Sequence, residues 1–204
     1  MHSKEARQKQ TFLRNEYLCA GKLKIPVVRR QPLMGDVKLI ACSDTKTKEK
    51  LNRDRGVHFF VDDYRFEHLY DNPQKSLHNS QYKFLLTPDY SLYADMPLWR
   101  QIENVAKNRW CGAYWQAHEL TVYPTISWGL SSTYDFCFDG VEQNAVVAIG
   151  MIGCKRNKTV FMRGYDAMLE RLNPKTVICF GTPFAEMRGN IISVDYLSSR
   201  KVVR

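Results

Sequence analysis

The chain has 204 residues, a formal net charge of +9 and a mean hydropathy of −0.42. This length is enough for one full hydrophobic core, and nothing in it requires a second domain. No signal peptide opens the chain and no apolar run approaches the length that spans a bilayer. We therefore expect a cytoplasmic protein that does not act on membranes.

The positive charge is concentrated at the two ends of the chain. Residues 1–50 carry 12 Lys and Arg against 5 Asp and Glu, residues 51–199 carry 15 against 16, and residues 200–204 carry 3 against none. A basic segment beside a nearly neutral body indicates contact with a polyanion, most often nucleic acid, whereas a solvated basic surface is the alternative. Arg29 and Arg30 follow an apolar run, unlike a simple basic tail, so we predict that both bind nucleic acid.

The cysteines are too widely spaced for a zinc knuckle or ribbon. Their positions are Cys19, Cys42, Cys111, Cys137, Cys154 and Cys179. Small buried thiols in apolar strands are common and inert. Together with the missing signal peptide, this usage indicates a reducing compartment.

The first third of the chain predicts few regular elements. Residues 1–20 have apolar side chains about one turn apart, which predicts a basic helix that docks on the body. Residues 25–41 contain two short apolar runs that suit extended segments, and residues 43–55 form a polar, Lys-rich connector. We therefore predict a basic N-terminal segment, residues 1–50, packed on a single α/β domain, residues 51–204.

From residue 57 onward, strand-like and helix-like stretches alternate. An apolar stripe predicts helices over residues 97–118 and 160–172. The strand candidates are residues 57–62, 83–87, 121–127, 145–150, 176–180 and 191–194. Continuous apolar strands alternating with helices predict an α/β fold with right-handed crossovers, either a mainly parallel open sheet or a partial barrel.

The strongest candidate site lies where the first two of these strands end. Asp62 and Asp63 follow one strand, and Asp89 follows the next. If the strands are parallel neighbours, about 4.8 Å apart, these side chains meet at one rim of the sheet. Paired carboxylates can bind a divalent cation such as Mg²⁺ or divide the roles of acid and base. Successive strand residues face opposite ways, so at most one of Asp62 and Asp63 points into the site.

We predict that Asp62, Asp63 and Asp89 are catalytic and that Asp62 and Asp89 are the metal ligands. The structural alternative is that Asp62 or Asp63 caps a short helix and that Asp89 organises a turn. Both interpretations remain open at this stage.

Several cations and one tryptophan are candidates for binding nucleic acid, because phosphates pair with Arg and bases stack on aromatic rings. We predict that Arg65 and Arg109 hold phosphate and that Trp128 lines the pocket. Residues 150–158 place two glycines before Lys155, Arg156 and a further lysine, a loop that could cradle phosphate. Large aromatics on a helix are nonetheless more often core. There is no Walker, dinucleotide or Gly-x-Ser-x-Gly motif, so nucleotide hydrolysis and serine esterase chemistry find no support.

Five stretches of the sequence together resemble the domain of unknown function 4417 family, which is carried by plasmids, conjugative elements and phages of Gram-positive bacteria. The stretches are residues 60–67, 87–97, 108–109, 124–129 and 136–140. The likeness covers roughly residues 55–195.

Members of this family are sometimes labelled replication-initiation proteins, and the chain is also similar in size and setting to small anti-CRISPR proteins, some of which truncate guide RNA. The resemblance therefore implies a mobile-element protein that acts on nucleic acid in the cytoplasm of a bacterial host cell, with RNA favoured over DNA and a Cas9-type ribonucleoprotein as a candidate partner. A rolling-circle initiator would have a His-hydrophobe-His motif, which the five histidines do not form.

Three functional classes remain open from the sequence. The first is an endonuclease that uses the rim carboxylates. The second is a non-enzymatic inhibitor or a replication-associated DNA-binding protein. The third is a barrel hydrolase acting on a small molecule, which would have a deep rim pocket and no salt-sensitive affinity for nucleic acid.

Overall fold

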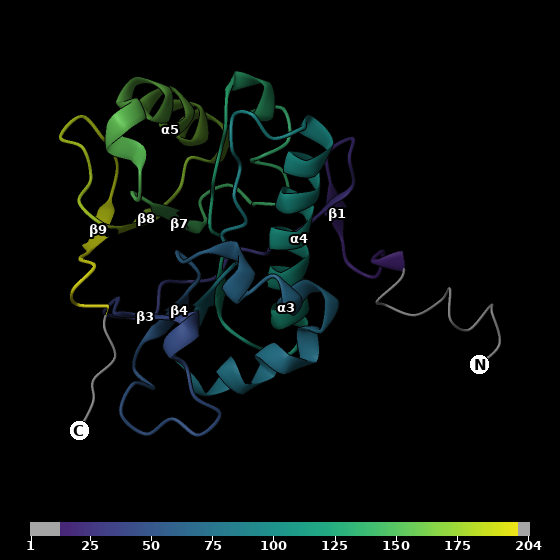
Figure 1. Ribbon diagram of the computed structural model, residues 1–204, viewed down its shortest axis with the longest axis vertical. Coiled ribbons are helices and arrows are strands. Elements are labelled where there is room, and N and C mark those ends of the chain that lie inside the picture. The colour runs from purple at the N-terminus through teal and green to yellow at the C-terminus, as the bar shows by residue number, and fades with distance from the viewer. Residues whose placement is uncertain (1–12, 200–204) are drawn as a thin grey trace.

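The computed structural model describes residues 13–199 of the protein (Figure 1). Its strands are β1 (Cys19–Ala20), β2 (Ile25–Pro26), β3 (Leu39–Ala41), β4 (Gly56–His58), β5 (Phe84–Leu86), β6 (Val122–Tyr123), β7 (Val146–Gly150), β8 (Thr176–Phe180) and β9 (Ile191–Val194). Its α-helices are α3 (His68–Asp71), α4 (Leu98–Ala117) and α5 (Lys158–Leu172). Its 3₁₀ helices are η1 (Cys42–Asp44), η2 (Asp63–Arg65), η3 (Pro73–Gln81), η4 (Ser131–Thr133) and η5 (Cys154–Asn157).

The strands from β3 to β9 are parallel and lie in chain order. Strands β3 to β6 pair successively, as do β7 to β9. A parallel bridge between Thr125 and Ala148 joins the two groups. There Ile126 donates its N–H to the Ala148 carbonyl at 2.8 Å, and Ala148 donates to the Pro124 carbonyl at 2.9 Å. The two groups therefore form one continuous layer in which each strand lies beside its predecessor.

This layer is strongly curled. In a flat sheet, four strand spacings would put β4 and β8 about 19 Å apart. The ring centroid of Phe180 in β8 nevertheless lies 4.3 Å from that of His58 in β4 and 5.0 Å from that of Phe60, just after β4. One buried cluster joins residues of β3 and of β5 to β9 with Phe60. The prediction of an α/β fold with a mainly parallel sheet is confirmed, and the curl gives the partial barrel.

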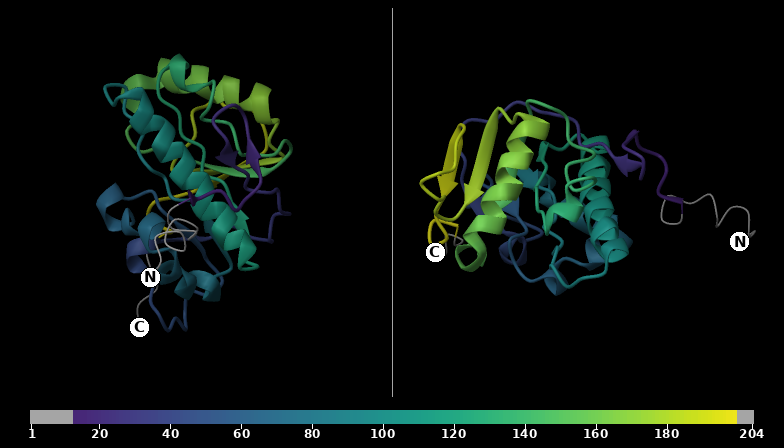
Figure 2. Two further views of the ribbon diagram at one scale, coloured as in Figure 1. Left: turned by 90° about the vertical axis from the view of Figure 1, so that its right-hand side faces the viewer. Right: turned by 90° about the horizontal axis from the view of Figure 1, so that it is seen from above.

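The two long helices cover the outside of the layer, as predicted from their apolar stripes. In α4, Trp110 and Trp115 pack in a cluster with Val57 of β4. In α5, Phe161, Tyr165 and Met168 pack in a second cluster with residues of β7 and β8. Figure 2 shows both helices flanking the strands, with β9 at one end of the molecule and the β1–β2 hairpin beyond α4 at the other. Among residues 13–199, no helix is both long and apolar enough to cross a membrane.

The N-terminal segment differs from its prediction. Residues 1–12 lie outside the described part and Leu13 is helical, but the prediction of a helix is wrong over residues 14–20. Cys19–Ala20 pairs with Ile25–Pro26 through a turn in which Gly21 has a φ of 68° and Lys24 a φ of 56°. This left-handed backbone does not continue a helix. Side chains four residues apart lie on the same face of a helix and of a strand. The apolar spacing alone therefore did not distinguish the two structures.

Strand β3 lies within residues 1–50, and its Leu39 and Ile40 are fully buried. The sheet therefore begins inside the predicted basic segment. The sheet contains residues from both sides of residue 50, because β3 pairs with β4. The division of the chain into two units at residue 50 stays a prediction.

Gly164 in α5 lets the indole of Trp128 pack on the helix. A Cβ at residue 164 would lie 2.1 Å from Cδ1 of Trp128. Replacing a helical glycine by alanine normally stabilises by about 1 kcal/mol, but a contact this short forces the ring to move. We expect Gly164→Ala to lower the free energy of unfolding by at least about 1 kcal/mol in urea titrations. In a Trp128→Leu background the same change should stabilise. Stabilisation in the native background would contradict the packing described here.

Candidate functional site

The carboxyl ends of the parallel strands meet at one rim, which holds a cleft of about 910 Å³. Segments that follow β3, β4, β5 and β7 form its walls. The three predicted catalytic acids, Asp62, Asp63 and Asp89, all line it, as does Arg65. The topology therefore brings the predicted acids to a common cleft at the end of the sheet where α/β proteins place ligands.

Asp63 links the loops that follow β4 and β5. Its Oδ2 accepts the backbone N–H of Ser91 at 3.0 Å, and its Oδ1 accepts the Ser91 hydroxyl at 2.9 Å. Asp62 is exposed at the cleft and makes no side-chain cap for η2. Only one of the two successive acids thus turns toward the neighbouring strand end. It is Asp63, rather than Asp62, that carries charge close to Asp89.

Asp89 is only partly exposed, and its Oδ1 accepts a hydrogen bond from the Ser127 hydroxyl. Burial raises the pKa of Asp89 to about 6; the bond from Ser127 opposes this shift and the negative charge of Asp63 adds to it. A carboxyl with such a pKa exchanges a proton near neutral pH, as general acids and bases do. Asp63 and Asp89 therefore form an unequal carboxyl pair.

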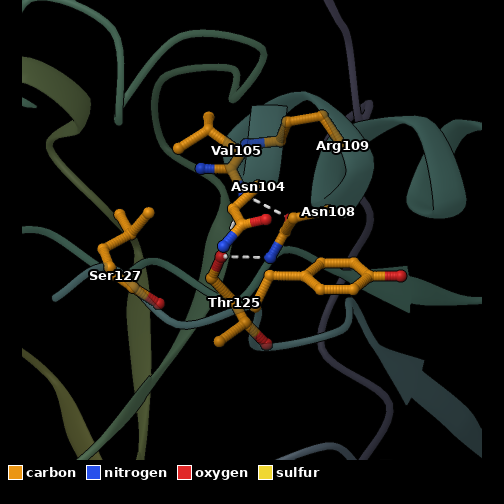
Figure 3. A pocket seen from close by; sticks show the side chains of 8 residues that line it. Asn104, Val105, Asn108, Arg109, Thr125 and Ser127 are labelled. Carbon is orange, nitrogen blue, oxygen red and sulfur yellow. Dashed lines mark hydrogen bonds between the residues drawn. The ribbon is translucent and has the colours of Figure 1, made fainter. Parts of the chain in front are cut away.

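Polar side chains of α4 hold the strand ends that carry this pair. Asn104 donates to the Ser91 carbonyl at 2.7 Å. Asn108 donates to the carbonyls of Pro88 at 2.7 Å and of Thr125 at 3.2 Å (Figure 3). Ser91, Pro88 and Thr125 all follow strands, so the helix fixes the geometry of the rim from outside the barrel.

Arg109, which we predicted to bind phosphate, belongs to this support and not to the cleft. Its side chain is 2% exposed. Its guanidinium donates to the carbonyls of Asp139 at 3.1 Å, Thr125 at 2.9 Å and Cys137 at 2.9 Å. It also donates to the side chain of Asn108 (Figure 3). The cavity beside it, about 10 Å³, has room for little more than one water. The prediction was wrong because Arg109 lies on the buried face of α4.

Four other predicted residues do lie at the rim. Arg65 lines the large cleft, while Lys155 and Arg156 are exposed in η5, which follows β7. Trp128 is half-buried and lines an adjoining cavity of about 110 Å³ together with Asp89. Its indole also packs against Phe161 of α5 at 5.1 Å.

Arg29 and Arg30 are exposed at the opposite end of the strands. The backbone of Arg29 is hydrogen-bonded to the Gln116 side chain near the end of α4. The N–H of Arg30 donates to Glu142, which precedes β7. The structure therefore does not bring these two arginines to the acidic cleft, and their contact with nucleic acid stays a prediction about a separate surface.

Sequence reasoning missed four residues of the rim. Tyr64 and Tyr93 line the cleft and are 69% and 62% exposed. Ser91 and Ser127 position the two acids. Both serines occupy the last place of a Pro-x-x-Ser pattern, which directly follows the predicted strand 83–87 at residues 88–91 and closes the predicted strand 121–127 at residues 124–127. That repeat was the available signal.

The donor set at the cleft is small. Within residues 13–199, no group of three or more His, Cys, Asp or Glu side chains is arranged to hold a metal ion. Asp63 and Asp89 supply two carboxylates, which suffices for Mg²⁺ only where water and substrate phosphates complete its shell. All six cysteines are free thiols. Burial raises the pKa of Cys154, near Asp89, to about 11, so it is a poor nucleophile at neutral pH.

A family described as Domain of unknown function (DUF4417) matches residues 17–197 of the chain. The chain belongs to this family. The match confirms the resemblance seen in the five motifs and extends it to the N-terminal hairpin.

Two relatives, both called Gene 1 protein, come from Mycobacterium phages D29 and L5. They are 42% and 40% identical to the chain over 129 residues, which is 61% of this chain and 48% and 56% of the relatives. The chain thus spans about half the length of the curated relatives it matches, and the similarity is to phage proteins. No solved structure matches the chain.

The raised pKa of Asp89 predicts a pH-dependent cost in stability. Because the folded protein binds this proton more tightly than the unfolded chain, stability falls as the pH rises from about 4 through about 6. Asp89→Asn should remove that cost and raise the free energy of unfolding by roughly 2 kcal/mol at pH 8, with almost no gain at pH 4. Asp95→Asn, at an exposed position, is the control. A less stable Asp89→Asn protein at pH 8 would refute this assignment.

The buried guanidinium of Arg109 predicts a large structural effect. Arg109→Leu leaves the carbonyls of Thr125, Cys137 and Asp139 without their donor, so we expect a loss of about 3–5 kcal/mol in the free energy of unfolding. Arg100→Leu, which breaks only ion pairs that are part-exposed, should cost less than about 1 kcal/mol. Comparable losses in the two variants would contradict the support role of Arg109.

Proposed function

We propose that this protein acts on nucleic acid at the rim cleft and cleaves single-stranded RNA there. The observation that carries the proposal is the unequal pair of Asp63 and Asp89 at the joined ends of β4 and β5, in a cleft of about 910 Å³. Two carboxyls whose environments differ can divide the roles of base and acid.

Cleavage of a phosphodiester needs one group to accept the proton of the attacking hydroxyl and another to protonate the leaving oxygen. Asp63, with oxygens oriented by Ser91, suits the first role, and Asp89, partly protonated near neutral pH, suits the second. Two carboxylates repel a phosphate, so an offsetting charge is needed. Mg²⁺ would be an alternative to this division of roles, because a carboxylate that binds the ion carries no proton to donate. Held by the ionised Asp63 and Asp89, it would offset their charge and polarise the phosphoryl group.

The mouth of the cleft suits a single strand. Tyr64 and Tyr93 offer exposed rings, and the Arg65 guanidinium lies 5.3 Å from the Tyr64 ring centre. Lys155 and Arg156 add exposed cations beside Gly153. Rings on which bases stack, flanked by cations for phosphate, are how proteins hold unpaired strands. The phage setting of the relatives supports the guide RNA of a Cas9-type effector as the candidate substrate.

The test is incubation of the protein with labelled guide RNA, alone and in its Cas9-type complex, with Mg²⁺ and with a chelator. We expect shortened products, and a loss of rate of at least about 100-fold in Asp63→Asn and in Asp89→Asn with RNA retention on filters unchanged. Asp95→Asn should cleave as the native protein does. The absence of shortened RNA in every combination would rule out the nuclease.

The second candidate function is inhibition by binding without chemistry. It is favoured by the exposed Arg29 and Arg30 at the opposite end of the strands, far from the acids. This function predicts that Asp89→Asn keeps full inhibitory activity, whereas the double variant Arg29→Gln, Arg30→Gln weakens it and flattens its dependence on salt. If the protein is a nuclease, Asp89→Asn should abolish its activity, and the double variant should have the smaller effect.

A further inference from the structure

A second pocket, of about 280 Å³, opens beside the acidic cleft at the mouth of the barrel. It shares Phe60, Val61 and Ile152 with that cleft. Its own walls include His58, Phe180 and Tyr196. The two cavities therefore adjoin, one acidic and the other aromatic.

His58 is a neutral hydrogen-bond donor in this pocket. Its Nδ1 accepts the backbone N–H of Phe60 at 3.2 Å, so the ring proton lies on Nε2. Burial lowers the pKa of His58 to about 3, which keeps the ring neutral at physiological pH. Among residues 13–199, no acceptor is found for the Nε2 proton. Nε2 is not fully buried, so water or a ligand in the pocket can accept this proton.

The aromatic walls are built by close packing. The rings of Phe60 and Phe180 stack at 10°, and Tyr196 meets Phe180 edge-on at 4.9 Å. Two glycines at strand ends make room for these rings. A Cβ on Gly181, whose φ is 105°, would lie 2.4 Å from the Tyr196 hydroxyl, and one on Gly150 would lie 2.8 Å from the Phe60 ring.

We propose that this aromatic pocket, walled by His58, Phe60, Phe180 and Tyr196, receives one unstacked nucleobase of the strand whose phosphate lies in the acidic cleft. The inference rests on the proposed function and adds a specificity subsite to it. The flat rings accommodate a planar heterocycle, and Nε2 of His58 donates to a ring nitrogen or carbonyl of the base.

The charges around the pocket favour a base over other ligands. Within residues 13–199, the lining of the pocket contains no Lys or Arg that would bind a phosphate or carboxylate. An acyl chain would leave the His58 donor unpaired. Tyr196 is 43% exposed, which leaves the entrance open. A base therefore satisfies the chemistry of the walls while its phosphate stays in the neighbouring cleft.

The experiment uses a short single-stranded RNA with one 2-aminopurine, whose fluorescence is quenched on stacking, and a matched strand with an abasic position. Both are titrated into the Asp89→Asn protein so that the strand stays intact. We expect quenching on binding and an affinity at least about 5-fold weaker for the abasic strand. Adding Tyr196→Ala or His58→Phe should reduce quenching and affinity, whereas Trp99→Ala, an exposed aromatic outside the pocket, should not. The abasic strand tests the pocket without altering its walls.

Equal affinity for the abasic strand, with no quenching, would overturn the base pocket. If the native protein still cleaves RNA in an Asp63- and Asp89-dependent way, the proposed function survives that result. Quenching that depends on Tyr196 in a protein that never cleaves RNA would support the pocket and sink the nuclease. Unaltered quenching in both Tyr196→Ala and His58→Phe would place the base elsewhere.

Discussion

The structure depends on one buried charge, the guanidinium of Arg109. A cation removed from water is costly unless its donors are satisfied, and here they are satisfied by three backbone carbonyls and by Asn108. All three carbonyls belong to the segment between β6 and β7. The same residue thus anchors α4 to the sheet and pins the loop that carries Trp128.

This anchoring explains how short strands can hold a defined rim. Strands β4, β5 and β6 have only two or three residues each. Their ladder hydrogen bonds alone would leave the following loops free. Asn104 and Asn108 of α4 donate hydrogen bonds to carbonyls of the loop that follows β5. Asp63 accepts a hydrogen bond from Ser91 and so joins the loops of β4 and β5. Asp89 is held in a place that raises its pKa, a cost in stability typical of functional carboxyls.

The sequence predicted the elements whose signal is local and repetitive. Continuous apolar runs located β8 and β9 residue for residue, and apolar stripes located α4 and α5 within two residues. The convergence of Asp63 and Asp89 followed from parallel pairing alone. The prediction for Arg109 failed because its role is set by carbonyls 16 to 30 residues away. Charge counts marked Arg29 and Arg30 but carry no information on which end of a strand they reach, and their contact with nucleic acid stays a prediction. The serines required knowledge of the loop geometry.

Strand β4 connects the two halves of the rim. Its outward-facing Val57 packs beneath α4, its inward-facing His58 reaches Phe180 across the barrel, and the turn that follows delivers Asp63 to the loop of β5. One short strand therefore links the acidic cleft to the aromatic pocket. Phe60 lines both cavities, and its ring packs directly over Gly150. A ligand that spans the rim would contact the acidic cleft and the aromatic pocket at a fixed spacing. A fixed spacing of this kind is what a protein needs in order to select one position along a nucleic-acid strand.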